Sequence, residues 1–309
     1  MNKPELLITP VSVNDILPLA EAGADAFVVG EQKFGLRLAG EFTPQEVKAA
    51  VELAHSKGKK VYVAMNALFH NEKIDMLGEY LNFLQEIKAD AVIFGDPAVL
   101  MAAKEHAPEM KLHWSTETTG TNWYTCNYWG RKGAKRAVLA REINMDAIVE
   151  TKENAEVEIE VQVHGMMNMF QSKRSLLGHY FEYQGKAMEV ENRKQERNMF
   201  LHDKERENKY PIFEDENGTH IMSPNDICII DELTDLVEAG INSFKIEGVL
   251  KSPEYILEVT KLYRKAIDLA VGDPEQYEDE KDSLLMEAEA LQPPNRPLDT
   301  GFFFKETVY

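Results

Sequence analysis

The sequence alternates short β-branched or aromatic segments with amphipathic helical stretches eight times, and this repetition constrains the fold more than any other feature. Such alternation is typical of βα units around a parallel sheet. Because eight units follow one another and no Gly-rich nucleotide-binding fingerprint follows any strand, the pattern favours a closed (β/α)₈ TIM barrel over an open doubly wound sheet. The expected strands cover 6–10, 26–30, 60–65, 91–96, 111–115, 136–141, 158–164 and 243–248. The expected helices cover 13–22, 44–56, 73–87, 97–106, 121–132, 144–152, 224–239 and 253–270.

One connection and the C-terminal tail break the rhythm. Residues 166–222, between the seventh strand and the seventh helix, form a far longer connection than an ordinary βα loop. In a barrel this connection lies on the C-terminal face, so we expect it to cover or complete a site. We therefore expect one barrel over 1–272, including this insertion, and a tail over 273–309 made of an acidic linker and an aromatic docking end.

Proline after a hydroxyl residue predicts three helix starts, at Thr43-Pro44, Ser223-Pro224 and Ser252-Pro253. The hydroxyl caps free backbone N–H groups, and the fixed φ of proline suits the first helical position.

Composition excludes several classes of protein. The chain has 34 Lys and Arg against 53 Asp and Glu, so its formal net charge is −19. An acidic surface repels phosphate backbones, so tight binding of nucleic acid requires a local basic patch or a partner. The two cysteines, Cys126 and Cys228, are too few for a disulfide framework or a four-cysteine zinc site. The sequence has no secretory leader and no run of 18 apolar residues, so we expect a cytoplasmic protein without membrane contact.

Strand alternation predicts polar side chains inside the barrel. In the eighth strand Phe244 and Ile246 would face the helices, which leaves Lys245 and Glu247 facing inward. In the seventh strand the same alternation turns His164 inward, together with Glu160 and Gln162. Buried charges cost several kcal/mol unless they pair, so they are retained either as mutual salt bridges or for a ligand.

Ionisable and amide groups also gather at the strand ends. Two interpretations remain open: these residues cap strands and form structural ion pairs, or they form a site. Taken together the set favours a site, because Arg and Lys among carboxylates suit an anionic organic substrate whose protons the acids handle. The set comprises Glu31, Asn66, Asp96, Glu117, Arg141, Glu142, His164, Lys245 and Glu247.

Several motifs resemble one known family, peptidase family U32, along nearly the whole chain. They are Val63-Ala-Met-Asn66, Phe94-Gly-Asp-Pro97, Ser115-Thr116-Glu117, Val138-Leu-Ala-Arg-Glu142, Val163-His-Gly165, Ser223-Pro-Asn-Asp-Ile-Cys228, and Ser243-Phe-Lys-Ile-Glu-Gly248 followed by Lys251-Ser252. Members of this family were long labelled collagenase-like proteases. The resemblance also implies oxygen-independent hydroxylation. Some relatives hydroxylate the wobble uridine of tRNA and use prephenate as the hydroxyl source, and others hydroxylate ribosomal RNA or the ubiquinone ring.

The resemblance fails at the cysteines that hold an iron–sulfur cluster in those relatives. Asn168 and Ser175 occupy the first two cysteine positions, although the neighbouring Arg174 matches the family. The third cysteine position lies near Asn192, where this sequence has no cysteine. Only Cys228 matches the fourth position. One thiolate cannot hold a cluster that needs about four. The resemblance therefore implies the family scaffold without a cofactor in this chain, and a cluster only in a partner.

The resemblance implies a subunit of prephenate-dependent 5-hydroxylation of the tRNA wobble uridine. This subunit would act in a hetero-oligomer with a cluster-bearing homologue, and tRNA would be bound through the complex. We expect Arg37, Arg141, Lys245 and His164 to contact the anion, and Glu31, Glu142 and Glu247 to orient it or handle protons. Further substrate contacts are expected from Asn66, Asp96, Glu117 and Arg174.

Two alternatives remain open. The first is a U32-type peptidase, although the sequence has no His-Glu-x-x-His zinc motif and no Gly-x-Ser-x-Gly elbow. The second is a barrel lyase that acts on a small carboxylic acid and uses Lys245 as an imine-forming amine.

Overall fold

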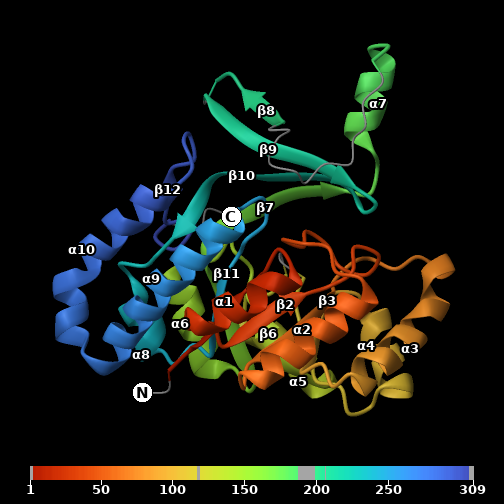
Figure 1. Cartoon of the computed structure of the whole chain (residues 1–309), viewed down its shortest axis with the longest axis horizontal. Helices are drawn as coiled ribbons and strands as arrows, with labels where there is room; N and C mark the ends of the chain where they lie inside the picture. The colour runs from red at the N-terminus through yellow and green to blue at the C-terminus, as the bar shows by residue number, and fades with distance from the viewer. Residues whose placement is uncertain (1–2, 117–118, 187–198, 206, 306–309) are drawn as a thin grey trace.

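Eight parallel strands close into a barrel (Figure 1). The computed structural model describes residues 3–116, 119–186, 199–205 and 207–305. Neighbouring strands pair in chain order, and the last strand pairs with both the first and the seventh, which closes the ring and confirms the predicted (β/α)₈ class. The barrel strands are β1 (Glu5–Ile8), β2 (Ala26–Val29), β3 (Lys60–Met65), β4 (Ala91–Phe94), β5 (Leu112–Trp114), β6 (Ala134–Val138), β7 (Glu158–Ser172) and β11 (Ser243–Ile246).

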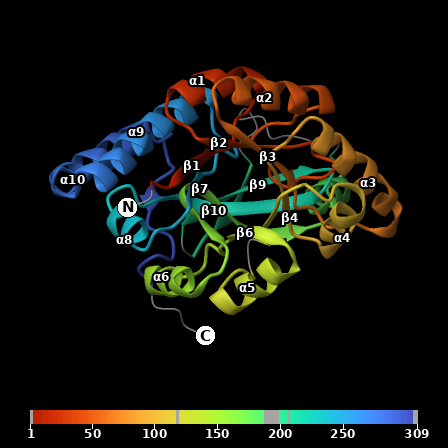
Figure 2. The same cartoon turned by 90° about the horizontal axis from the view of Figure 1, so that it is seen from below.

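Helices surround this ring on the outside (Figure 2). The apolar side chains on the outer faces of the strands, Phe244 and Ile246 among them, pack against the helices in one continuous core. The first helix follows a 3₁₀ turn, Val13–Asp15. The barrel helices are α1 (Ile16–Glu21), α2 (Pro44–Ser56), α3 (Asn71–Glu86), α4 (Pro97–His106), α5 (Trp123–Lys132), α6 (Met145–Asn154), α8 (Leu233–Glu238) and α9 (Pro253–Gly272).

Two of the three predicted caps are present. The Thr43 and Ser252 hydroxyls accept hydrogen bonds from the N–H groups of Glu46 and Tyr255, at the starts of α2 and α9. The helix predicted over 224–239 is wrong, because its first residues continue strand β10 and α8 starts only at Leu233. Pro224 lies at a register shift of β10, where the ladder does without a proline N–H.

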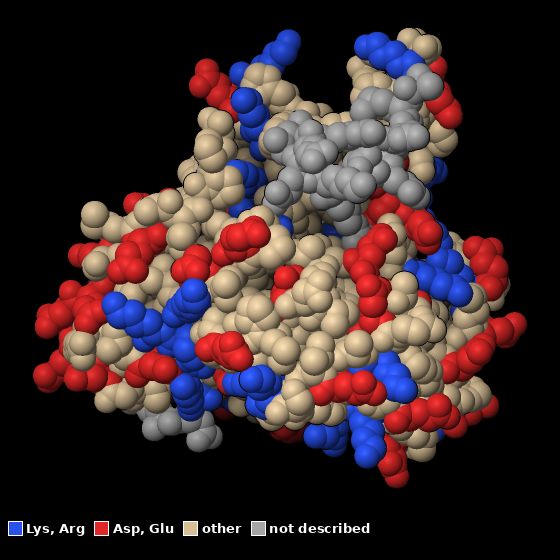
Figure 3. Space-filling model, in the orientation of Figure 1, with Lys and Arg blue, Asp and Glu red and all other residues tan. Residues whose placement is uncertain are grey.

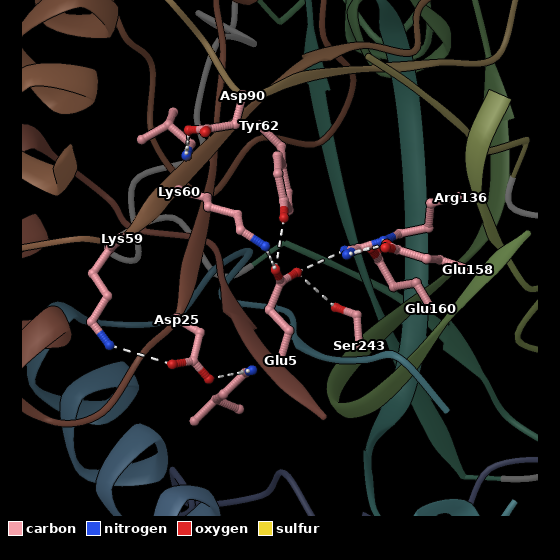
Figure 4. Close-up of polar contacts among 12 residues, drawn as sticks. Glu5, Asp25, Lys59, Lys60, Tyr62, Asp90, Arg136, Glu158, Glu160 and Ser243 are labelled. Atoms are coloured by element: carbon pink, nitrogen blue, oxygen red, sulfur yellow. Dashed lines mark hydrogen bonds and ion pairs between the residues drawn. The ribbon is translucent and has the colours of Figure 1, made fainter. Parts of the chain in front are cut away.

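A network of charges fills the N-terminal end of the barrel (Figure 4). The Arg136 Nη1 atom lies 2.7 Å from Glu5 Oε1 and 3.2 Å from Glu160 Oε2, and its Nη2 atom lies 2.8 Å from Glu158 Oε2. The Tyr62 hydroxyl also donates to Glu5, at 2.7 Å. Despite its burial, the Glu5 carboxyl has a pKa lowered to about 2, because Arg136 favours its charged form.

The insertion is a sheet extension above the C-terminal mouth of the barrel (Figure 1). Strand β7 runs on past the barrel to Ser172 and pairs antiparallel with β10 (Gly218–Cys228), which pairs with β9 (Asn208–Asp215). Strand β8 (Phe200–Asp203) pairs with β9, and helix α7 (Leu176–Tyr183) projects beside them. The hydrophobic periodicity of 166–222 is weak because the segment combines strands and a helix, whose side chains repeat with different periods.

The C-terminal segment packs against the barrel. The expectation of an acidic linker is wrong, since residues 274–291 form helix α10 (Pro274–Leu291), which lies against α9. Tyr277, Leu284 and Ala288 lie on one face of α10 and are buried, which anchors an otherwise acidic helix. Beyond it, β12 (Leu298–Asp299) pairs with β10, and Phe303 is buried. None of the helices described here has the length and apolar character needed to cross a membrane.

Candidate functional site

A pocket opens at the C-terminal mouth of the barrel, under the insertion. Its charged lining contains three cations and two acids. The remaining walls come from barrel strands and the residues just after their C-terminal ends, from the loop after β2, and from the insertion strands β7 and β10. Such a lining can hold an organic anion while acidic groups lie beside it. The lining residues are Thr9, Val28, Leu36, Arg37, Leu38, Ala39, Ala64, Asn66, Ile93, Ser115, Val138, Arg141, Glu160, Met166, Asn168, Met222, Lys245, Glu247 and Val249.

Lys245 and Glu247 form one side of the pocket. The Lys245 Nζ atom lies 2.9 Å from Glu247 Oε2, and both side chains are largely buried. The other oxygen, Oε1, accepts hydrogen bonds from the Thr9 hydroxyl at 3.2 Å and from the Val249 N–H at 3.3 Å. Three donors therefore fix this carboxylate, and the ammonium group beside it faces the pocket.

Arg141 follows β6, which is separated from β11 by β7 alone, and its side chain is oriented from β7. Its Nε atom donates to Gln162 Oε1. The Gln162 amide nitrogen in turn donates to the carbonyl of Met166 at 3.0 Å, where β7 leaves the barrel. An amide fixed at both ends holds the guanidinium in place, and planar guanidinium groups suit carboxylates.

Arg37 and Asn66 join the loop after β2 to the pocket. The Asn66 side chain accepts a hydrogen bond from the N–H of Leu36 at 2.8 Å, which holds the loop against the end of β3. Arg37 has a φ of +51° and is 7% exposed, so a non-glycine residue occupies the left-handed region beside the pocket. Backbone strain of this kind persists only where surrounding contacts hold it, and it is concentrated at functional sites.

Five predicted site residues thus line the pocket: Arg37, Asn66, Arg141, Lys245 and Glu247. The other five that the structure describes, Glu31, Asp96, Glu142, His164 and Arg174, lie outside the pocket lining. Asp96 caps α4, accepting from the Ala98 N–H at 2.9 Å, and does not line the pocket. Glu142 and Arg174 are exposed outside the pocket lining.

Glu31 is half-buried and does not line the pocket. Burial raises the pKa of its carboxyl. The pKa of the nearby Tyr80 hydroxyl is also raised, mainly by burial and further by the negative charge of Glu31. Glu117, predicted to contact substrate, lies outside the described residues.

His164 faces the helices, so the prediction that it points into the barrel is wrong. One residue of β7, Val163, has no partner in β11, and this β-bulge reverses the alternation that the sequence predicts. The His164 Nε2 atom lies 2.7 Å from the Tyr255 hydroxyl of α9, and its ring lies edge-on to Tyr263. Burial lowers the pKa of His164 to about 4, so the ring is neutral near pH 7.

Glu160 is a pocket residue that the strand-end set lacks. Alternation along β7 turns Glu160 inward, and this pattern in the sequence could have identified it as a pocket residue. It is 1% exposed, and burial raises the pKa of its carboxyl although Arg136 opposes this shift. Its carboxylate links the charge network at the barrel bottom to the pocket above. Thr9, Ser115 and Asn168 also line the pocket without having been in the predicted set.

The residues at the cluster-ligand positions do not fit an iron–sulfur cluster. Asn168 lines the pocket, Ser175 is exposed at the start of α7, and Asn192 lies outside the described residues. Cys228 is the one thiol of the set, and its Sγ lies 3.5 Å from the Tyr263 hydroxyl. Burial raises its pKa to about 11, so it is a neutral thiol near pH 7, whereas clusters are held by several thiolates.

The fold and the site define a class of protein: a closed (β/α)₈ barrel with a cationic pocket beneath a β-rich insertion. The family model of peptidase family U32 matches residues 12–308, and the chain belongs to this family.

Known relatives share both sequence and fold with this chain. It is 71% identical over 309 residues to tRNA hydroxylation protein P2 of Bacillus subtilis (strain 168), covering 100% of both chains. It is 33% identical over 302 residues to tRNA hydroxylation protein P1 of the same strain, covering 97% of this chain and 71% of that relative. A solved structure titled as a U32 peptidase superposes with a TM-score of 0.51 at 16% identity, over 79% of this chain and 92% of the other, which is a likeness of fold.

Proposed function

We propose that this protein is a component of tRNA hydroxylation, acting in the prephenate-dependent 5-hydroxylation of the wobble uridine. The observation that carries the proposal is the 71% identity to tRNA hydroxylation protein P2, which extends over the whole of both chains. The pocket supports it, because the mouth of a TIM barrel is where active sites form.

Prephenate is the proposed occupant of the pocket. It carries two carboxylates, and the lining offers Arg37, Arg141 and Lys245 as cationic partners. Glu247 is fixed beside Lys245 and suits the orientation of a bound molecule or the handling of its protons. A lyase would need Lys245 as a neutral amine that forms an imine. The ion pair with Glu247 stabilises the charged ammonium form, which supports anion binding at Lys245 over that alternative.

A homologous subunit is the proposed source of the redox chemistry. The donor set around Cys228 offers one buried, neutral thiol, so we assign the iron–sulfur cluster to a partner. A paired arrangement agrees with the names of the relatives P1 and P2, which occur in one bacterial strain and both match this chain.

The same complex would bind tRNA, in the cytoplasm. The chain carries a formal charge of −19, which opposes a phosphate backbone. Figure 3 shows acidic and basic side chains interspersed over the barrel, with Lys and Arg at the tips of the two projections formed by the insertion. The insertion, residues 166–222, has nine Lys and Arg against ten Asp and Glu, so the negative charge resides almost entirely in the rest of the chain.

Deletion of the gene tests the proposal. We expect loss of 5-hydroxyuridine-derived nucleosides from tRNA, measured by mass spectrometry in a strain that lacks any paralogue with overlapping activity. Restoration by the wild-type gene but not by a gene encoding R141M with K245M would tie the loss to the pocket. Unchanged nucleoside levels would refute the assignment to tRNA hydroxylation.

A second assay addresses the peptidase label of the family. Pure protein is incubated with gelatin, with and without a chelator, and fragments are followed by electrophoresis. We expect no cleavage, and cleavage that tracks with the protein through purification would favour the peptidase.

A further inference from the structure

A buried chain of polar contacts joins Arg37 of the pocket to the insertion. The Arg37 Nη1 atom lies 3.4 Å from Gln171 Oε1 in β7 and 3.4 Å from His220 Nδ1 in β10. The other ring nitrogen of His220, Nε2, lies 3.0 Å from Asp215 Oδ1 in β9. His220 is fully buried, and the side chain of Asp215 is 3% exposed. The guanidinium is thus connected to three neighbouring strands of the insertion.

The sheet register produces this arrangement. In the ladder His220 lies opposite Gln171 of β7 and Phe213 of β9, so the three side chains share one face. The Phe213 ring stacks on His220, with ring centroids 4.8 Å apart, and fixes the plane of the imidazole. The turn after β9 adds a second attachment, since Asn217 donates to the carbonyl of Gln32 at 2.8 Å in the loop that carries Arg37.

The chemistry of the partners determines the tautomer of His220. A guanidinium has donors and no acceptor, so Nδ1 must present its lone pair to Arg37. The proton of the neutral ring is then on Nε2 and is donated to Asp215. A histidine with its proton on Nδ1 would direct two donors at each other and leave the Asp215 carboxylate without this bond.

We propose that His220, oriented by Asp215, is a positioning residue that directs the Arg37 guanidinium into the pocket. His220 does not line the pocket, whereas Arg37 does. The insertion thereby determines the affinity of the barrel site for an anion, and the contact also supports the left-handed backbone at Arg37. The proposal deepens the proposed function, on which it rests for the identity of the anion.

Three substitutions of His220 separate its two contacts. In H220N the amide oxygen occupies the place of Nδ1 and can still accept from Arg37. In H220Q the amide reaches the place of Nε2, so the contact with Asp215 is kept and the acceptor for Arg37 is lost. H220F keeps the stacking on Phe213 and loses both contacts. The matched control is H55Q, because His55 forms a pair with Asp90 at 2.9 Å on the protein surface.

Binding of prephenate to the purified full-length chain, followed by calorimetry, gives the first test. We expect H220F, H220Q and R37M to weaken binding about tenfold, the loss of one charge-assisted contact, while H220N and H55Q stay within about twofold of wild type. Thermal unfolding of each variant checks that it is folded. Equal weakening by H220N and H220Q would indicate a packing role and overturn the proposal, as would unchanged binding in H220F.

A measurement without ligand separates this inference from the proposed function. In protein labelled with ¹⁵N-histidine, the ring signals of His220, assigned by their absence from H220N, report which nitrogen carries the proton. We expect a protonated Nε2 and a bare Nδ1 in wild type, and a change of the Nδ1 signal in R37M. A proton on Nδ1, or a signal indifferent to R37M, would overturn the positioning role. If wild type shows the expected tautomer and no affinity for prephenate, the proposed ligand is wrong and the positioning of Arg37 stands.

Discussion

The two ends of the barrel both carry buried charges, but they use them differently. At the N-terminal end Arg136 contacts three carboxylates at 2.7 to 3.2 Å, and each oxygen it meets belongs to the protein itself. At the C-terminal end the cations Arg141 and Lys245 line a pocket, where they face space that a ligand can enter. A closed ion network stabilises the fold, whereas cations beside a cavity can bind an anion. Charge inside a barrel therefore indicates a site only where a pocket adjoins it.

The largest expected effect comes from breaking the network at the bottom. R136M removes the buried cation that Glu5 and Glu160 share, and we expect a loss of about 3–5 kcal/mol in the free energy of unfolding. Urea denaturation measures it, with K48M as control, because Lys48 forms only an exposed pair with Glu52 at 3.9 Å. A loss below about 1 kcal/mol would mean that the network contributes no more than a surface pair.

The next effect concerns His164, which is buried outside the barrel wall near the mouth. Its pKa is about 4 in the folded protein against 6.5 for an exposed histidine, so the unfolded chain binds the extra proton as pH falls below 6.5. Stability therefore declines between pH 6.5 and pH 4, by about 3 kcal/mol from this group, and is unaffected by it above pH 6.5. H164Q should flatten that part of the curve of unfolding free energy against pH. An unchanged slope, with H55Q as comparison, would show that His164 is not the responsible group.

At the mouth, binding should change more than stability. R141M removes one cation from the pocket lining, and we expect prephenate binding to weaken tenfold or more, since hydrogen bonds to charged groups contribute about 1.5–3 kcal/mol. Calorimetry gives the affinity and urea denaturation gives the stability of the same samples. If R141M destabilised the protein as much as R136M and left binding intact, the two ends would not differ in the way proposed.

The smallest expected effect sharpens the comparison within the bottom network. Lys60 pairs with Glu5 at 3.1 Å, but its side chain is 56% exposed. We expect K60M to cost under about 1 kcal/mol of unfolding free energy, because solvent screens an exposed pair. The same denaturation assay measures it, and a cost equal to that of R136M would contradict the role given to burial.

The sequence by itself determined the barrel, because periodicity and chain order are local properties. Eight repeats of strand and helix predict eight parallel neighbours, and alternation turns Lys245 inward and Phe244 outward, as the structure has them. The positions of Arg141, Asn66 and Arg37 around one mouth follow from the rule that parallel strands end on the same face.

Tertiary structure decided the features that depend on one residue in a ladder or on distant partners. A single bulge at Val163 turned His164 toward α9, because side-chain direction has a period of two and one extra residue reverses it. Asp96 serves as a helix cap since a nearby N–H lies within reach, which residue type alone does not reveal. The contact between His220 and Arg37 joins residues 183 positions apart, and only the folded insertion brings their nitrogens to 3.4 Å.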